Sequence, residues 1–234
     1  MGEKGSAACA KSSPQLISWS KYHKKIVRIE CSFSSNPSFI NAKKKPSYKK
    51  QLRPQSPEIQ IPLKTLLYLA TNWPEPDPSA AGTRTLQLLS LFEERNWKIH
   101  LMSAATPREH SAPLPEHISR SELVLNDSRM DGIFQALDPD LVMFDRFMLE
   151  EQYGWRVEKN CPQALRLLDS IDVHSLRDIR RRALHQNRER SPQDWFSDIA
   201  LRELASIYRC DLTLLISGAE YSILTEEVHI PPSL

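Results

Sequence analysis

The sequence predicts a doubly wound α/β domain with a mostly parallel sheet, preceded by a basic extension. Three observations lead to this fold class. Six short apolar runs of strand length alternate with amphipathic helical segments from residue 61 onward. Most of these runs lack alternating polar residues, as expected for strands that are covered on both faces. Strand and helix follow each other in the order that right-handed crossovers wind into a single sheet.

The first strand–loop–helix unit runs from Lys64 to Arg95. Its apolar run, Leu66–Ala70, precedes three alternating prolines, which fit neither a central strand nor a helix interior. A helical pattern begins at Ser79, and its leucines and Phe92 form one broad apolar face. A loop of small residues before a helix places backbone N–H groups at the carboxyl edge of a sheet. Open α/β sheets bind ligands at that edge.

The remaining elements follow from the same patterns. Further strands are predicted at Trp97–Met102, Leu123–Leu125, Leu141–Phe144, Ala164–Leu168 and Leu212–Ile216. Helices are predicted at Asn126–Leu137, Phe147–Lys159, Ser175–Arg190, Asp194–Tyr208 and Tyr221–Val228. We expect Trp155 and Trp195 to pack in the core. Together these elements predict one Rossmann-like domain over residues 61–234.

Residues 1–60 differ from the rest of the chain in charge. They hold 12 Lys and Arg against three acids, whereas the remainder holds 19 against 26. A mildly acidic globular part argues against nucleic acid as its main partner. No apolar run reaches the roughly 20 residues of a membrane helix, so no transmembrane segment is predicted. The four cysteines lack CxxC spacing, so we expect free thiols in a reducing compartment and a cytoplasmic protein.

The basic extension, residues 1–60, has three interpretations. Its Ser- and Lys-rich composition buries too little apolar area to fold, which predicts a disordered segment. A basic, nearly acid-free N-terminus is also typical of a mitochondrial or other organelle presequence. Finally, Met1–Ser6 fits the bare myristoylation pattern, with lysines downstream as a second membrane signal.

Three segments resemble a known family. The loop Ser79–Arg84 (SAAGTR) resembles the glycine-rich loop in the N-terminal domain of GT-B-type glycosyltransferases of the group 1 or family 4 kind. The segment Pro139–Asp145 (PDLVMFD) resembles that domain's fourth strand, and Cys210–Ser217 (CDLTLLIS) resembles the strand that closes it. The order and spacing of the three agree with the family over about Leu63–Val228.

The resemblance implies a two-domain enzyme that moves a sugar from a nucleotide-sugar donor to an acceptor, with retention and without a bound metal or other cofactor. The N-terminal domain holds mostly the acceptor, and the C-terminal domain holds the nucleotide-sugar through a Glu-x7-Glu pair. Glu150 and Glu158 have that spacing without the family's surroundings, which we interpret as coincidence. The second domain would begin near Leu234. We therefore expect a half that is inactive or incomplete alone: a truncated isoform, an incomplete gene model, or a subunit with a separate C-terminal-domain partner.

The resemblance also implies a ligand-binding role for the first loop. Ser79, Ala81 and Gly82 would approach the donor phosphates, and Arg84 could reach an anion one helical turn later. Alternatively, the loop is only a tight strand-to-helix connection, and Arg84 is solvated.

Two further pairs follow later strands. Asp145 and Arg146 end a buried strand and are candidate ligand-binding residues, or else a helix N-cap and a surface arginine. His174 and Asp172 are the candidate catalytic residues, because in the family a histidine after this strand faces the sugar. Otherwise they are a loop histidine and a helix cap.

The rest of the chain offers less specific signals. The arginine run between 177 and 190 could dock anionic lipid or phosphate, or form a solvated helix face. No order of residues supports a hydrolase triad or a zinc site. A non-catalytic α/β module that binds a phosphate-bearing ligand or a protein is the alternative to the glycosyltransferase. Exposed apolar surface near Tyr221–Leu234 would favour the half-enzyme, because a missing domain leaves an uncovered patch.

Overall fold

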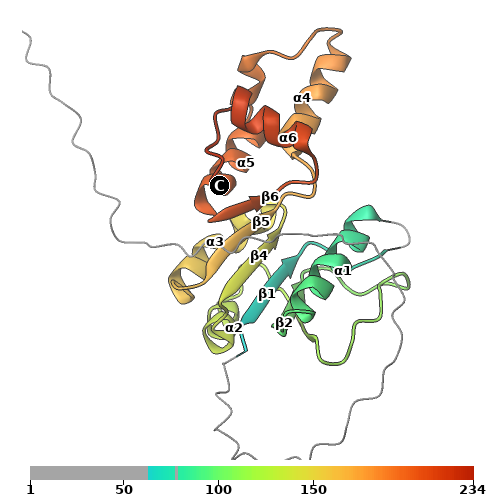
Figure 1. The fold of residues 1–234 in the computed structure, drawn as a ribbon, viewed down its shortest axis with the longest axis vertical. Helices are drawn as coiled ribbons and strands as arrows, with labels where there is room; N and C mark the ends of the chain where they lie inside the picture. The colour runs from blue at the N-terminus through green and yellow to red at the C-terminus, as the bar shows by residue number, and fades with distance from the viewer. Residues whose placement is uncertain (1–62, 77–78) are drawn as a thin grey trace, which may run out of the picture. The chain divides into compact units, whose positions relative to one another are not determined.

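The structure is a computed structural model that describes residues 63–76 and 79–234. The predicted disordered extension, residues 1–60, lies outside these ranges. The described chain contains a parallel six-stranded sheet in the order β3-β2-β1-β4-β5-β6 (Figure 1). Its strands are β1 (Thr65–Ala70), β2 (Lys98–Ser103), β3 (Ser119–Glu122), β4 (Leu141–Asp145), β5 (Leu165–Asp169) and β6 (Leu212–Leu214). The predicted doubly wound, Rossmann-like α/β fold is confirmed.

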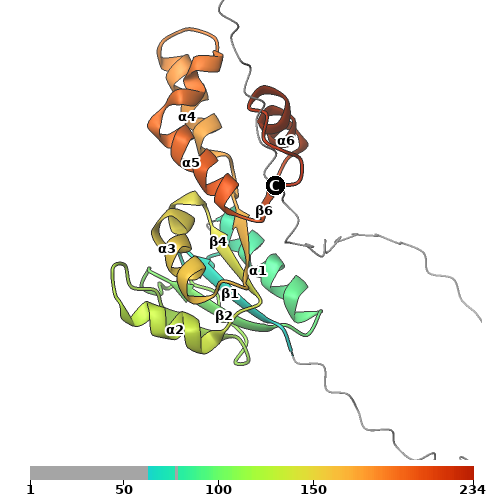
Figure 2. The same cartoon turned by 90° about the vertical axis from the view of Figure 1, so that its left-hand side faces the viewer.

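Helices cover both faces of the sheet. They are α1 (Ala80–Glu93), α2 (Arg129–Leu137), α3 (Phe147–Asn160), α4 (His174–His185), the 3₁₀ turn η1 (Pro192–Phe196), α5 (Asp198–Arg209), α6 (Gly218–Ser222) and the π-helical turn η2 (Ile223–Glu227). Helix α1 lies on one face, and α2, α3 and α5 lie on the other (Figures 1 and 2). Among the described helices, none is long and apolar enough to cross a membrane.

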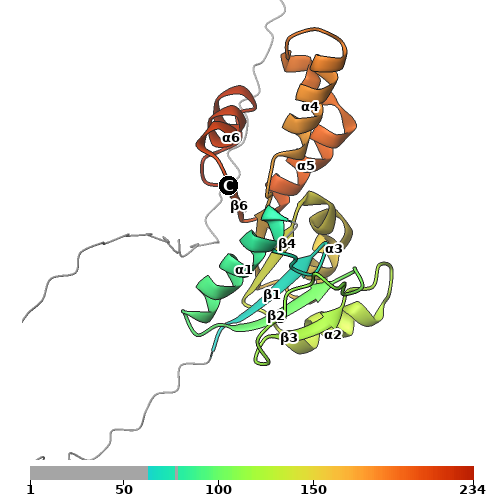
Figure 3. The ribbon, with the colours of Figure 1, turned by 90° about the vertical axis from the view of Figure 1, so that its right-hand side faces the viewer.

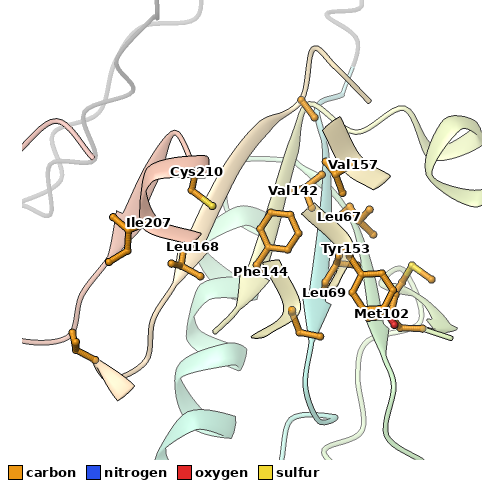
Figure 4. Close-up of a cluster of buried hydrophobic side chains, with 14 of the residues drawn as sticks. Leu67, Leu69, Met102, Val142, Phe144, Tyr153, Val157, Leu168, Ile207 and Cys210 are labelled. Carbon is orange, nitrogen blue, oxygen red and sulfur yellow. The ribbon is translucent and has the colours of Figure 1, made fainter. Parts of the chain in front are cut away.

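Alternate residues of the central strands pack into two hydrophobic cores, one on each face of the sheet. In β1, Leu67 and Leu69 point toward α3, where they meet Tyr153 and Val157 (Figure 4). Their neighbours Leu66 and Tyr68 point the other way, into the core under α1. Because β1 has no solvent-facing side, its sequence reads as a continuous apolar run rather than an alternating one.

The third strand lies elsewhere than predicted. It spans Ser119–Glu122, whereas the sequence favoured Leu123–Leu125. As an edge strand it pairs only with β2 and is half-exposed, so polar residues are tolerated there. Leu123, the first residue of the predicted run, comes after the strand and packs into the core.

Two helix boundaries also differ from those predicted. Helix α4 ends at His185, because Asn187 adopts a positive φ of 48°, and α5 begins only at Asp198 after a 3₁₀ turn. Trp195 is buried as expected, but Trp155 is 52% exposed, with the Arg156 guanidinium 4.4 Å from its ring centre. The expectation of a core position for Trp155 is wrong.

The C-terminal segment is only partly exposed. Leu224 and Ile230 join the main core, whereas Tyr221 and the preceding Ile216 are half-exposed. The carbonyl of Leu234 accepts a hydrogen bond from the backbone N–H of Thr213 in β6. The described part of this region therefore presents scattered apolar side chains rather than one broad patch.

A buried ion pair joins α3 to α5. Glu150 is almost wholly buried, and both its oxygens accept hydrogen bonds from Arg209 at 2.6–3.1 Å. A side chain at Gly154 would collide with the Glu150 carboxylate, so glycine leaves room for the pair. Glu158 is exposed and lies 3.5 Å from Arg166, so these two glutamates have separate partners.

We expect Arg209→Ala to destabilise the fold by about 2–3 kcal/mol, because it leaves the Glu150 carboxylate buried without its cation. Arg202→Ala is the matched control. It removes an exposed ion pair with Glu151 and should cost less than about 1 kcal/mol. Urea unfolding of both variants measures the difference. Equal losses would show that burial of Glu150 does not depend on Arg209.

Candidate functional site

The candidate site lies where the strand order reverses, at the carboxyl ends of β1 and β4. Crossovers from these two neighbours leave toward opposite faces, through α1 and α3 (Figures 1 and 3). The two strand ends are joined by Thr71, whose backbone N–H donates to Asp145 Oδ2 at 2.9 Å. The Thr71 hydroxyl donates to the Asp145 carbonyl at 3.2 Å. Ligands of open α/β sheets bind at such a switch point.

Asp145 is a buried carboxylate at this edge with only one of its oxygens hydrogen-bonded among the described residues. The residue is 4% exposed, and its Oδ1 has no hydrogen-bond partner among the described residues. The Arg146 guanidinium lies 3.3 Å from the other oxygen, Oδ2. Burial raises the pKa of the Asp145 carboxyl above its usual range, and Arg146 and Thr71 offset this only in part. A buried acceptor atom without a partner is a candidate ligand contact.

Tyr68 lies in the same neighbourhood, inside β1. Its side chain is fully buried, and its hydroxyl has no hydrogen-bond partner within the described chain. Burial raises the pKa of Tyr68 far above its normal value, and the charges of Asp145 and Asp169 raise it further. The nearby Thr85 hydroxyl donates to the carbonyl of Ala81 at 3.0 Å.

Arg84 is paired with Asp169 rather than free to meet an anion. Asp169 ends β5 and has no exposed surface. Arg84 Nε donates to both its oxygens, at 2.9 and 3.1 Å, and Nη2 donates to Oδ1 at 2.8 Å. This bidentate pair fixes the first turn of α1 to the end of β5.

Two residues at this edge have backbone conformations that favour glycine. Arg146 has φ 74° and ψ 157°, a region that is nearly restricted to glycine. Its N–H donates to the carbonyl of Asp169 at 2.9 Å, which holds the strained residue beside β5. Ile171, just after β5, has φ 60°, and the Asp172 N–H donates to the Ser170 carbonyl at 2.6 Å, as in a γ-turn. Such strain persists only where surrounding contacts enforce it.

The glycine of the first loop contacts the protein itself. A Cβ on Gly82 would overlap the backbone of Glu75, so the close approach that this glycine indicates is to the preceding loop. The hydroxyl of Ser79 caps the helix by accepting from the Gly82 N–H at 3.1 Å. The predicted phosphate contacts of Ser79, Ala81 and Gly82 stay predictions, and the space on the Glu75 side of Gly82 is occupied.

His174 is the first residue of α4 and is largely buried. Its ring nitrogen Nδ1 lies 3.0 Å from the Asp172 carbonyl, and Phe147 packs edge-on at 5.7 Å between ring centres. The Asp172 carboxylate pairs with Arg177 at 3.0 Å. The predicted catalytic roles of His174 and Asp172 stay predictions. Their positions place them at the end of β5, one strand away from the switch point.

The N-terminus of α4 is capped by a carboxylate from another helix. Glu203 of α5 accepts from the backbone N–H groups of His174 at 3.0 Å and Ser175 at 2.7 Å. It also accepts from the Ser175 hydroxyl at 2.5 Å. Burial raises the pKa of Glu203, and these hydrogen bonds oppose that shift. The first N–H groups of α4 are therefore occupied by the protein's own carboxylate.

Four site residues were not singled out in the sequence: Thr71, Tyr68, Asp169 and Glu203. One signal could have revealed Asp169. Strands β4 and β5 both end an apolar run with aspartate, and Asp145 and Asp169 are paired in register. Tyr68 and Glu203 gave no such signal, since each fits an ordinary strand or helix pattern.

Comparison with known proteins identifies no family for this chain. No family model matches the chain, and no curated protein matches it. One solved structure, described as an NAD-dependent epimerase/dehydratase from Methylobacillus flagellatus, aligns with 11% identity and a TM-score of 0.38. The alignment covers 67% of this chain and 54% of that one. Such a similarity carries no information about ligand or activity.

We expect Gly82→Ala to cost about 1–3 kcal/mol of stability, because the added methyl group meets the Glu75 backbone. The control is Gly132→Ala in α2, where the new Cβ lies in open space. That change should stabilise the fold by roughly 0.5–1 kcal/mol through helix propensity. Urea unfolding tests both. An unchanged stability of Gly82→Ala would mean that the loop does not pack on α1.

We expect Asp145→Asn to gain stability relative to the wild type as pH rises above about 4. The folded-state pKa of Asp145 is raised above the unfolded value, so its contribution falls as pH rises through the folded pKa and then levels off. Asp131→Asn should show the opposite trend, because Arg156 lowers the pKa of that carboxyl. Thermal unfolding between about pH 2 and 8 measures both differences, because the Asp131 contribution changes mainly below the ordinary carboxyl pKa of about 4. Parallel trends in the two variants would contradict the assignment.

Proposed function

We propose that this domain binds the sugar acceptor of a GT-B-type glycosyl transfer, as the N-terminal half of that enzyme. Two features support the proposal. The three family-like segments fall on the start of α1, on β4 and on β6, in the expected order. The all-parallel sheet has its switch point between β1 and β4, where a ligand of such a fold would bind.

The balance of charges at the switch point favours a neutral sugar, the acceptor substrate, over the diphosphate of a donor. Two carboxylates, Asp145 and Asp169, lie beside two guanidinium groups, Arg84 and Arg146. A diphosphate requires an excess of positive charge or free N–H groups. Sugar hydroxyls instead donate to carboxylates and accept from guanidinium groups. The free Oδ1 of Asp145 is the acceptor atom that a sugar hydroxyl would fill.

The first helix supports the same choice. Its start is capped by Ser79, and the Glu75 backbone lies against Gly82. A donor diphosphate therefore has less room at α1 than in a glycine-rich dinucleotide site. In the proposed enzyme, the second domain would supply most contacts to the nucleotide-sugar. His174 and Asp172 would act on the sugar only in that complete cleft.

The test is ligand-observed NMR on the full chain with neutral mono- and disaccharides, nucleotide-sugars, NAD and inorganic phosphate. We expect a neutral sugar to bind and the phosphate-bearing compounds to bind at least about tenfold more weakly. Asp145→Asn should weaken sugar binding by roughly tenfold, because it removes the charged acceptor. Glu158→Gln, an exposed carboxylate elsewhere on the domain, is the matched control.

Arg146→Gly adds a second readout. It should abolish sugar binding and change stability little, because the relief of backbone strain is opposed by the loss of the cation beside the buried Asp145 carboxylate. Tight binding of a nucleotide-sugar, NAD or phosphate without sugar binding would overturn the proposal. That result would instead favour the non-catalytic module for a phosphate-bearing ligand.

A further inference from the structure

We propose that the far end of the helical arm formed by α4, η1 and α5 binds the surface of a membrane rich in anionic lipid. This inference concerns a surface separate from the switch point and does not depend on sugar binding there. It rests on the shape of the arm, on its exposed apolar side chains and on its charge.

The arm extends past the carboxyl ends of the strands. Figures 1, 2 and 3 show α4 and α5 standing side by side, with their connection at the end far from the sheet. The C-terminal part of α5 packs on α3 through Arg209 and Glu150. The last turns of α4 and the connection to α5, residues 180–198, therefore form the tip of the arm.

Two large apolar side chains are exposed at this tip. Leu184 is 81% exposed and Phe196 is 74% exposed, the highest values for large apolar residues in the described ranges. Their sequence neighbours Ala183 and Trp195 are both buried. The backbone around Leu184 and Phe196 is therefore held in place by packing, although these two side chains themselves are exposed. Two strongly exposed large apolar side chains at one protruding end are candidates for an interaction surface.

The tip is also basic. Residues 180–198 hold five arginines and three acidic residues, a net charge of +2. Arg188 is held by Asp194 at 2.6 and 2.8 Å, and Arg190 by Glu227 at 3.1 and 3.3 Å, and these pairs shape the turn. Arg180 is exposed and has no ion pair with any described residue. Its charge is available to an external anion.

An open hollow of about 740 Å³ lies beside these groups. Its lining includes Arg180 and Leu184 on α4 and Trp195 on η1. Residues 180 and 184 are one helical turn apart and share a face of α4. A lipid phosphate next to Arg180 would leave Leu184 beside the acyl chains, and the hollow has room for the head group.

A bilayer fits these features better than a nucleic acid or a folded protein. Interfacial segments combine arginines at the head-group level with Leu and Phe below it. A nucleic acid offers no apolar phase for Leu184 and Phe196, and its binding rests on phosphate contacts alone. A folded partner would require a shaped apolar face, whereas the tip presents two separate apolar side chains.

The experiment is co-sedimentation of the full chain with vesicles of phosphatidylcholine containing roughly one third phosphatidylserine, and with pure phosphatidylcholine vesicles. We expect at least about tenfold stronger partitioning onto the anionic vesicles. The basic residues 1–60 can also contribute to this binding, so the tip variants decide the outcome. The double variant Leu184→Ser/Phe196→Ser should lower partitioning by about tenfold, and Arg180→Gln should lower it about threefold.

The matched controls are Leu201→Ser, at a position 49% exposed on the body of α5, and Arg95→Gln after α1. Both should change partitioning less than twofold, and unfolding midpoints should confirm that every variant is folded. Equal partitioning of the wild type and the double variant would overturn the proposal. Binding of duplex RNA or DNA that requires the same tip residues and displaces the vesicles would also overturn it.

Discussion

The pairing of Arg84 with Asp169 is the interaction on which the carboxyl edge of this sheet depends. A carboxylate with no exposed surface is costly to bury without a partner, and three hydrogen bonds from one guanidinium group stabilise it. The pair links the first turn of α1 to the end of β5, two strands away from β1. It therefore brings the start of α1 across the switch point and places Arg84 inside the site rather than in solvent.

Several other features of the edge follow from this arrangement. Arg146 keeps a conformation suited to glycine because its N–H is bound to the Asp169 carbonyl while its side chain faces Asp145. The Glu75 backbone packs on Gly82, which closes the start of α1 from one side. The result is a compact edge in which charges are balanced and one buried carboxylate oxygen is unused. Such an edge suits an uncharged, hydroxyl-rich ligand better than a diphosphate.

The helical arm is stabilised at its base and exposes apolar side chains at its tip. Its inner side is held by buried carboxylates, with Glu203 capping α4 and Glu150 binding Arg209 of α5. Its tip instead exposes Leu184 and Phe196 among arginines. The arm therefore combines a base fixed by buried ion pairs and caps with a tip that carries apolar and basic side chains. This combination is typical of a protein surface that binds a membrane. The switch point and the arm are thus two separate candidates for function on one domain.

The sequence by itself determined the fold class, because continuous apolar runs of strand length alternate with amphipathic helices, which is the pattern of a sheet covered on both faces. It also located Asp145, Arg146 and His174 near strand ends. The position of the edge strand β3 was predicted incorrectly, because a half-exposed strand does not require a run of apolar residues. Only the tertiary structure paired Arg84 with Asp169, placed Glu75 against Gly82 and left Asp145 Oδ1 without a partner among the residues it describes. These contacts depend on the three-dimensional fold, either because the residues are far apart in the chain or because the backbone geometry sets them. Local composition therefore cannot predict them.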